Sequence, residues 1–248
     1  MMLNPLVIKF NSSMKVRYSY LNQQFSNAPD LWNQLKKFVE TGDFTLGKEL
    51  TKFEKKFASL IGTKYAVGVN SGTDAIKLSL KALDIKPGDE VITAANTFVA
   101  TVGAICEIGA IPIFVDCDDS FCMNTNLIEK KITKKTKAII VVHLLGLPAS
   151  MSKILKIAKK YNLKIIEDSA ECMFAKYKNK SVGSFGDIGC FSTYMAHYLV
   201  TGIGGFATTN NYNIANSDPL EISQCGCDLD LSATVSCDTC CWVKITLI

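Results

Sequence analysis

The chain has 248 residues, of which 48% are hydrophobic and 20% are charged, as expected for one large folded domain or one domain with part of a second. Its 27 basic and 23 acidic residues leave a formal net charge of +4, spread along the chain without a one-signed block. These values argue against intrinsic disorder and against a nucleic acid partner.

The apolar segments are too short for a membrane protein. Residues 1–10 contain too short an apolar run for a signal peptide, and no other segment reaches the length of a membrane span. We therefore expect a cytoplasmic protein without a membrane partner. Ten cysteines are present, but half lie beyond residue 224, and the others, such as Cys106 and Cys190, are typical of reduced core thiols.

The first elements in chain order are helical. Residues 29–44 and 48–62 show helical periodicity on either side of a glycine-containing turn, so we expect an N-terminal helical segment over residues 1–62.

From residue 64 the chain alternates between two periods. Short apolar runs rich in valine and isoleucine predict strands buried on both faces, at residues 64–70, 89–95, 110–116, 137–146 and 163–170. Helical patterns separate them, at residues 72–84, 96–109, 126–132 and 151–162. Repeated strand–helix–strand units predict an α/β domain over residues 63–210, with a mainly parallel sheet and helices on both faces. After it, periodicity fades into a Cys-rich tail at residues 211–248.

In an open parallel sheet, ligands bind beyond the carboxyl ends of the strands. The first strand runs into Ser71, Gly72 and Thr73 at the start of a helix, where free backbone N–H groups and hydroxyls suit a phosphate. The alternative is that Ser71 or Thr73 is simply an N-cap.

Three further side chains follow buried strands. Asp168 ends an apolar run, and a carboxylate there could hold a proton on a heterocyclic nitrogen or cap the next turn. Phe98 could stack on a flat cofactor ring, although an aromatic residue at a helix start is more often a core residue. His143, inside an apolar strand, is more typical of the core than of catalysis.

These features together resemble a fold-type I pyridoxal-phosphate enzyme. Residues 42–116, 139–171 and 182–192 are similar to the DegT/StrS family of nucleotide-sugar aminotransferases. The resemblance implies that the backbone and hydroxyls around Gly72, with Ser192, bind the cofactor phosphate, that Phe98 stacks on the ring and that Asp168 pairs with its nitrogen. Glu171 stands where the family often has glutamine, and a carboxylate can accept but not donate a hydrogen bond there. The implied cofactor-binding positions are Ser71, Gly72, Thr73, Phe98, Asp168, Glu171 and Ser192.

The family places a lysine five residues after this serine, where it holds pyridoxal phosphate as an imine. Here the position is His197, and no lysine lies between Lys180 and Lys244. A minority branch, the 3-dehydratases of nucleotide-linked 4-keto-6-deoxysugars, also carries histidine. This resemblance implies pyridoxal or pyridoxamine phosphate bound without a covalent tether, with His197 and Asp168 as catalytic residues and His197 as the base.

Two alternatives remain open at this point. One is a nucleotide-sugar aminotransferase that uses glutamate as amino donor. The other is a catalytically silent member, because the family continues into a smaller C-terminal domain that residues 211–248 do not resemble; we expect this tail to be truncated or divergent. The family also implies a homodimer.

The tail suggests a minor alternative. Related dehydratases acting on CDP-linked sugars hold a [2Fe–2S] cluster on cysteines that include a C-x-C pair. Cys225 and Cys227 form such a pair, with Cys237, Cys240 and Cys172 as further candidates. Their spacing and flanking residues depart from the pattern, so we assign no metal ligands.

Overall fold

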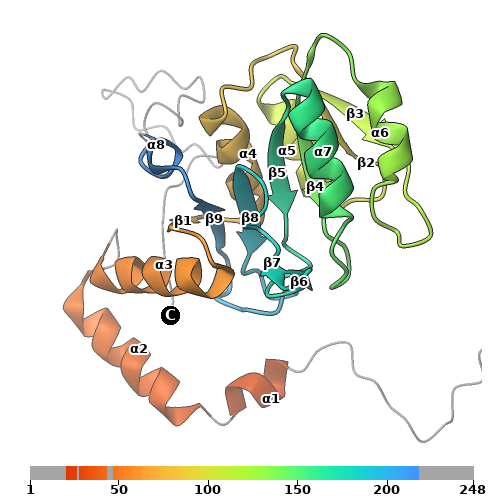
Figure 1. Cartoon of the computed structure of the whole chain (residues 1–248). Coiled ribbons are helices and arrows are strands. Elements are labelled where there is room, and N and C mark those ends of the chain that lie inside the picture. The colour runs from red at the N-terminus through yellow and green to blue at the C-terminus, as the bar shows by residue number, and fades with distance from the viewer. Residues whose placement is uncertain (1–20, 27, 44–46, 218–248) are drawn as a thin grey trace, which may run out of the picture. The chain divides into compact units, whose positions relative to one another are not determined.

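The computed structural model describes residues 21–26, 28–43 and 47–217 (Figure 1). The chain divides into two compact units, residues 1–41 and 42–248. The first contains helices α1 (Leu21–Ser26) and α2 (Pro29–Thr41). The second contains all the remaining described elements and every predicted site residue that falls in the described part of the chain.

A seven-stranded sheet forms the second unit, in the order β1-β9-β8-β5-β4-β2-β3. Its strands are β1 (Tyr65–Val69), β2 (Glu90–Ala94), β3 (Ile111–Val115), β4 (Thr136–Val142), β5 (Lys164–Asp168), β8 (Ile188–Ser192) and β9 (Gly205–Thr209). Only β9 runs antiparallel to its neighbours, β1 and β8. The predicted α/β fold with a mainly parallel sheet is confirmed.

Helices cover both faces of this sheet (Figure 1). They are α3 (Lys48–Ile61), α4 (Gly72–Ala82), α5 (Val99–Glu107), α6 (Thr125–Lys131), α7 (Met151–Tyr161) and α8 (Tyr212–Ala215). Ile105 of α5 packs in one core cluster with Ile166, and Ile154 of α7 packs in the other with Ile165. Because successive strand residues point to opposite faces, α4 and α5 cover one face and α6 and α7 the other.

Helix α3 packs against the end of the sheet that contains β8 and β9. The ring of Phe57 stacks on that of Phe206 with centroids 4.9 Å apart and meets the edge of Phe191 at 5.1 Å. All three are buried. Within the predicted N-terminal helical segment of residues 1–62, these rings join α3 to the sheet.

Strands β8 and β9 and the hairpin of β6 (Lys176–Tyr177) and β7 (Lys180–Ser181) were not assigned from the sequence. Glycine and threonine interrupt their apolar pattern, but these residues have structural partners here. The hydroxyl of Thr208 donates to the carbonyls of Gly183 at 2.7 Å and Gly189 at 3.3 Å. Thr208 can therefore be buried in β9 because carbonyl groups of β8 and of the turn before it accept hydrogen bonds from its hydroxyl group.

The ends of β8 and β9 lie directly against the start of α4. A Cβ atom added at Gly205 would lie 2.3 Å from the carbonyl oxygen of Ser71, and one added at Gly72 would lie 2.7 Å from the Cβ atom of Ser192. Glycine at both positions allows the helix start and the hairpin to touch.

We expect Gly205→Ala to lower the free energy of unfolding by about 1–3 kcal/mol or more, because the added methyl group would overlap the backbone of Ser71, which cannot rotate away. Gly103→Ala in α5 is the matched control, since nothing lies within 4 Å of the added Cβ. It should raise stability by about 0.5–1 kcal/mol through helix propensity. Denaturant titration of both variants tests the contact, and a neutral Gly205→Ala would contradict it.

Candidate active site

The start of α4 has the features of an anion site. Ser71 is the N-cap, and its Oγ accepts a hydrogen bond from the Asp74 amide at 3.0 Å. The capping interpretation of Ser71 is therefore confirmed, while the amides of Gly72 and Thr73 have no intrahelical acceptor. Ser192 touches Gly72 from the end of β8. Two amides and the hydroxyls of Thr73 and Ser192 thus lie at one helix N-terminus, where the dipole favours an anion.

Asp168 lies on the same face of the sheet as Ser192. In the register of β5 and β8 it is opposite Cys190, two residues before Ser192. Its Oδ2 accepts from the hydroxyl of Thr101 at 2.7 Å, and its Oδ1 accepts from the Ala170 amide at 3.3 Å. Burial raises the pKa of Asp168, although these two hydrogen bonds act in the opposite direction.

Thr101 was not singled out in the sequence, because a single hydroxyl in an apolar helix gives no specific signal. It is fully buried, and its Oγ1 lies 2.8 Å from that of Thr97. Its amide donates to the carbonyl of Phe98 at 3.1 Å. Thr101 therefore connects the helix start that carries Phe98 with the carboxylate of Asp168.

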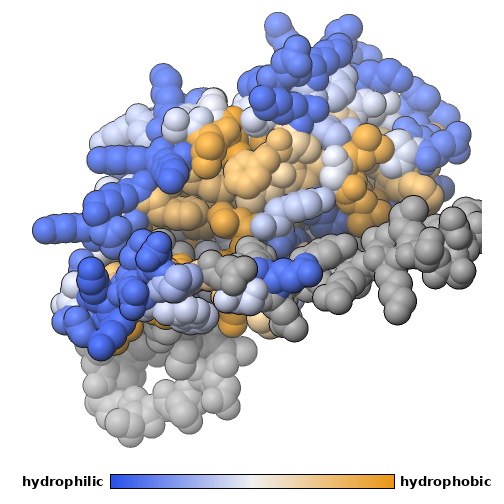
Figure 2. Space-filling model, turned by 90° about the horizontal axis from the view of Figure 1, so that it is seen from below, coloured by the Kyte–Doolittle hydropathy of each residue, from blue (hydrophilic) through white to orange (hydrophobic). Residues whose placement is uncertain are grey.

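The side chain of Phe98 is 68% exposed, at the N-cap of α5, so the alternative that Phe98 is a core residue is wrong. Other large apolar side chains are also exposed near the strand ends. They are Val99 at the start of α5 and, in the loops that follow β4 and β8, Leu145, Leu147, Tyr194, Met195, Tyr198 and Ile203. Figure 2 looks onto the edge where β5 and β8 end and shows a broad apolar surface there. An exposed ring at this edge is available for stacking.

His197 lies in the loop of residues 193–204, between β8 and β9. The loop is closed at its base, where the hydroxyls of Thr193 and Thr201 are 2.6 Å apart. The half-buried imidazole has its pKa lowered by burial, while the charges of Glu171 and Asp168 act to raise it. His197 is thus in the electrostatic field of both carboxylates, and a neutral imidazole can accept a proton.

Glu171 is tied to the loop that follows β4. Its Oε2 accepts from the Leu145 amide at 3.2 Å, and its backbone carbonyl accepts from the Gly146 amide at 3.0 Å. The acceptor-only chemistry expected of a carboxylate is used here for a backbone amide. Asp168 and Glu171 thus both act electrostatically on His197, and we call these three residues the charged cluster.

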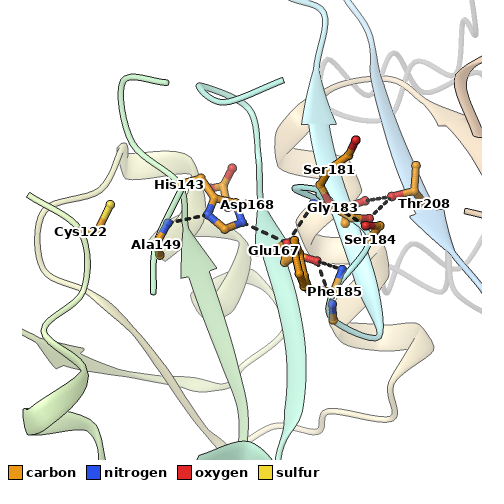
Figure 3. A network of polar contacts seen from close by, with 12 residues as sticks. Cys122, His143, Ala149, Glu167, Asp168, Ser181, Gly183, Ser184, Phe185 and Thr208 are labelled. Carbon is orange, nitrogen blue, oxygen red and sulfur yellow. Dashed lines mark hydrogen bonds and ion pairs between the residues drawn. The ribbon is translucent and has the colours of Figure 1, made fainter. Parts of the chain in front are cut away.

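His143 and Glu167 form a separate network on the opposite face of the sheet (Figure 3). Both side chains are fully buried, and His143 Nε2 lies 3.1 Å from Glu167 Oε2. The interpretation of His143 as a core residue is confirmed. It does not share the face of Asp168.

The cysteines of the proposed cluster, Cys225 to Cys240, lie outside the described residues. Cys172 is described and buried, with its pKa raised to about 11 by burial, which disfavours the thiolate that a metal needs. Within residues 21–26, 28–43 and 47–217, no group of three or more histidine, cysteine or acidic side chains could hold a metal ion. The cluster therefore has no support.

Asp168→Asn tests the cost of burying this carboxyl. Because its pKa is raised above the ordinary value of 3.8, the folded state binds the proton more tightly, and stability falls as pH rises from about 3.8 through the folded-state pKa. Asparagine does not titrate, and Thr101 can reverse its hydrogen bond. We expect the variant to be at least as stable at pH 7 in denaturant titration. A loss above about 1 kcal/mol would show that ionised Asp168 stabilises the fold.

The histidine titration tests the charged cluster. NMR of the two histidine rings should give His197 a midpoint below 6.5. Glu171→Gln should lower it further, because a negative charge that favours the imidazolium is removed. The control is Glu129→Gln, which removes a surface carboxylate paired with Lys160 at 2.8 Å. An unchanged His197 midpoint in Glu171→Gln would show that the charge of Glu171 does not act on His197.

Residues 27–234 match the sequence profile of the DegT/DnrJ/EryC1/StrS aminotransferase family. This range is wider than residues 42–192, within which the motifs of the resemblance lie. The chain is 47% identical over 175 residues to a UDP-N-acetyl-3-dehydro-α-D-glucosamine 3-aminotransferase of Acidithiobacillus ferrooxidans, covering 70% of this chain and 47% of that protein.

Two solved structures are similar in fold. NtdA of Bacillus subtilis, with bound pyridoxamine phosphate, has a TM-score of 0.76 and 36% identity over 81% of this chain and 46% of its own. The E. coli GDP-4-keto-6-deoxy-D-mannose-3-dehydratase, with bound hydrated pyridoxal phosphate, has a TM-score of 0.71 and 32% identity over 75% of this chain and 49% of its own. The chain spans about half the length of the curated relatives it matches. It belongs to the DegT/DnrJ/EryC1/StrS aminotransferase family.

Proposed function

We propose that this chain carries the cofactor site of an enzyme that removes the 3-hydroxyl group of a nucleotide-linked 4-keto-6-deoxysugar, using pyridoxal or pyridoxamine phosphate without a covalent tether. The observation that carries the proposal is His197, which stands in the field of Asp168 and Glu171, at the position where the resemblance implies a tethering lysine. An imidazole can move protons there but cannot form the imine that a lysine forms.

The residues at the strand ends fit this cofactor. The amides of Gly72 and Thr73 suit its phosphate, because they have no intrahelical acceptor at the start of α4. The close contact between Gly72 and Ser192, which a Cβ at position 72 would prevent, brings the Ser192 hydroxyl to the same place. The exposed ring of Phe98 suits stacking on a flat heterocycle. Asp168 offers a carboxylate whose burial penalty is offset when it pairs with a protonated ring nitrogen.

When bound, the cofactor supplies an electron sink that stabilises the charge left by proton removal next to its ring. Asp168 would hold a proton on the ring nitrogen and so maintain that sink. His197 would serve as the base for the proton at the carbon next to the ring, because burial lowers the pKa of its imidazole and so favours the neutral form that accepts a proton. A positioned base of this kind contributes about a hundred- to ten-thousandfold to a rate.

A nucleotide-sugar aminotransferase with glutamate as amino donor is the second candidate. It is favoured by the 47% identity to the A. ferrooxidans aminotransferase. In that case His197 would transfer the proton in place of the tethering lysine, and no covalent bond would join the cofactor to the chain. The third candidate, a silent family member, predicts no absorbance change when pyridoxal or pyridoxamine phosphate is added.

The partners follow from the same proposal. We infer a nucleotide-linked sugar as substrate and a homodimer as the assembly, because the loops around Phe98 and Tyr198 expose apolar side chains that a second copy would cover. A cytoplasmic location remains part of the proposal. Among the described residues, no helix is long and apolar enough to cross a bilayer.

His197→Lys tests the role of this position. After incubation with pyridoxal phosphate and reduction with borohydride, peptide mass spectrometry should find the adduct at residue 197 in the variant and not in the unaltered chain. With substrate present, the variant should gain an imine absorbance band and lose elimination of the 3-hydroxyl group.

The control is His197→Gln, which removes the imidazole without supplying an amine and should show neither adduct nor elimination. A site-specific adduct on another lysine of the unaltered chain would reveal a tether and refute the proposal. If the amine introduced by His197→Lys stays unmodified while other lysines react, position 197 does not face the cofactor.

A further inference from the structure

The carboxylate of Glu167 is fully occupied by hydrogen-bond donors. Its Oε1 accepts from the amides of Phe185 at 2.6 Å and Gly186 at 2.8 Å, and its Oε2 accepts from the amide of Gly183 at 2.8 Å and from His143 Nε2 at 3.1 Å. A carboxylate has about four acceptor positions, so none remains for a ligand or a substrate. Glu167 is the centre of a closed network (Figure 3).

The hydrogen bonds of His143 define its tautomer. Its Nδ1 lies 3.0 Å from the amide nitrogen of Ala149, which can only donate. Nδ1 is therefore the acceptor, and Nε2 carries the proton that it donates to Glu167. The imidazole thus connects the loop that follows β4 with the turn that precedes β8.

The first of these segments reaches the active site directly. The amide of His143 donates to the carbonyl of Asp168 at 3.0 Å. Beyond it, Leu145 and Gly146 form a tight turn with φ of 49° and 85°, and their amides hold Glu171. Leucine in this left-handed conformation is strained. The turn therefore depends on contacts on either side of it, including the hydrogen bond that the Ala149 amide donates to His143.

The second segment has no room to adjust. A Cβ at Gly183 would lie 2.2 Å from the ring of Phe191, and one at Gly189 would lie 2.3 Å from the carbonyl oxygen of Gly183. The carbonyl of Gly183 also accepts from Thr208. Because the turn is held this closely, a displacement of Glu167 must be passed on to β8, which ends at Ser192.

We propose that Glu167 and His143 are positioning residues of the cofactor site. From the far face of the sheet they fix two backbone segments: the loop after β4, whose amides hold Asp168 and Glu171, and the turn before β8, the strand that ends at Ser192. Neither side chain needs to touch cofactor or substrate. The expected effect on cofactor binding rests on the proposed function. The geometry of the charged cluster, in contrast, can be measured without any cofactor.

Two substitutions at position 143 separate positioning from simple packing. His143→Leu keeps a side chain of similar size and removes both ring hydrogen bonds. His143→Gln is the conservative rescue, because its carbonyl can accept from Ala149 and its amide can donate to Glu167. Ile128→Ala is the matched control: it opens a cavity in the core on the same face of the sheet and lowers the melting temperature without touching the network.

Two readouts are needed. The first is the dissociation constant for pyridoxamine 5′-phosphate, from its fluorescence. We expect His143→Leu to weaken binding about tenfold, as loss of an outer-shell partner typically does at metal sites, and His143→Gln to stay within about twofold of the unaltered chain. The second is the NMR titration of His197 without cofactor. In His143→Leu its midpoint should fall, because Glu171 and Asp168 move away and raise its pKa less.

The inference is overturned if His143→Leu keeps both values, or if Ile128→Ala changes them as much. Should His143→Leu fail to fold, His143→Asn takes its place, since it keeps the acceptor for Ala149 and is too short to reach Glu167; unchanged values there count equally against the inference. If the unaltered chain binds no pyridoxamine phosphate, the proposed function fails, whereas the His197 titration still decides the positioning role.

Discussion

The alternation of side chains along β5 is the constraint on which the site depends. Because successive residues point to opposite faces of a sheet, the adjacent carboxylates of Glu167 and Asp168 receive different surroundings. Glu167 points to the face of α7 and is surrounded by backbone amides and His143. Asp168 points to the face of α4 and α5, where Thr101 and one amide hold it. One strand end therefore supplies one carboxylate that is fully engaged within the fold and one that can still accept hydrogen bonds.

The hydrogen bonds explain why the two acids differ in chemical capacity. Four donors leave Glu167 no acceptor position for a ligand. Asp168 accepts hydrogen bonds from only two donors. Its pKa is raised because burial disfavours the charged form more than these two hydrogen bonds favour it. A buried carboxyl group of this kind is stabilised by a cationic partner. The protonated ring nitrogen of the proposed cofactor is a partner of that kind.

The helix start at Gly72 and the hairpin of β8 and β9 complete the arrangement. Gly205 lies against the backbone of Ser71, and Ser192 lies against Gly72, so the proposed phosphate cradle is built from two segments distant in sequence. The same hairpin carries the loop with His197. These two packing contacts therefore set the proposed phosphate cradle and the loop with His197 relative to each other.

The amino-acid pattern predicted much of this molecule. The apolar runs of β1 to β5 and the periodic helices α4 to α7 were assigned correctly, because buried parallel strands and amphipathic helices have distinct periods. Strands β8 and β9 were not assigned, since their glycines and threonines look like loop residues until the turns that satisfy them are known. Thr101 was missed for a related reason: its partner, Asp168, is distant along the chain.

The sequence by itself determined the α/β fold class, the family, and the identity of the residues at the strand ends, including a histidine at position 197. These properties depend on local periodicity and residue type. Only the tertiary structure decided which groups surround Asp168 and Glu167, that Phe98 is exposed, and that Asp168 and Glu171 act electrostatically on His197. Side-chain environment depends on contacts between residues far apart in the chain, and no local pattern records them.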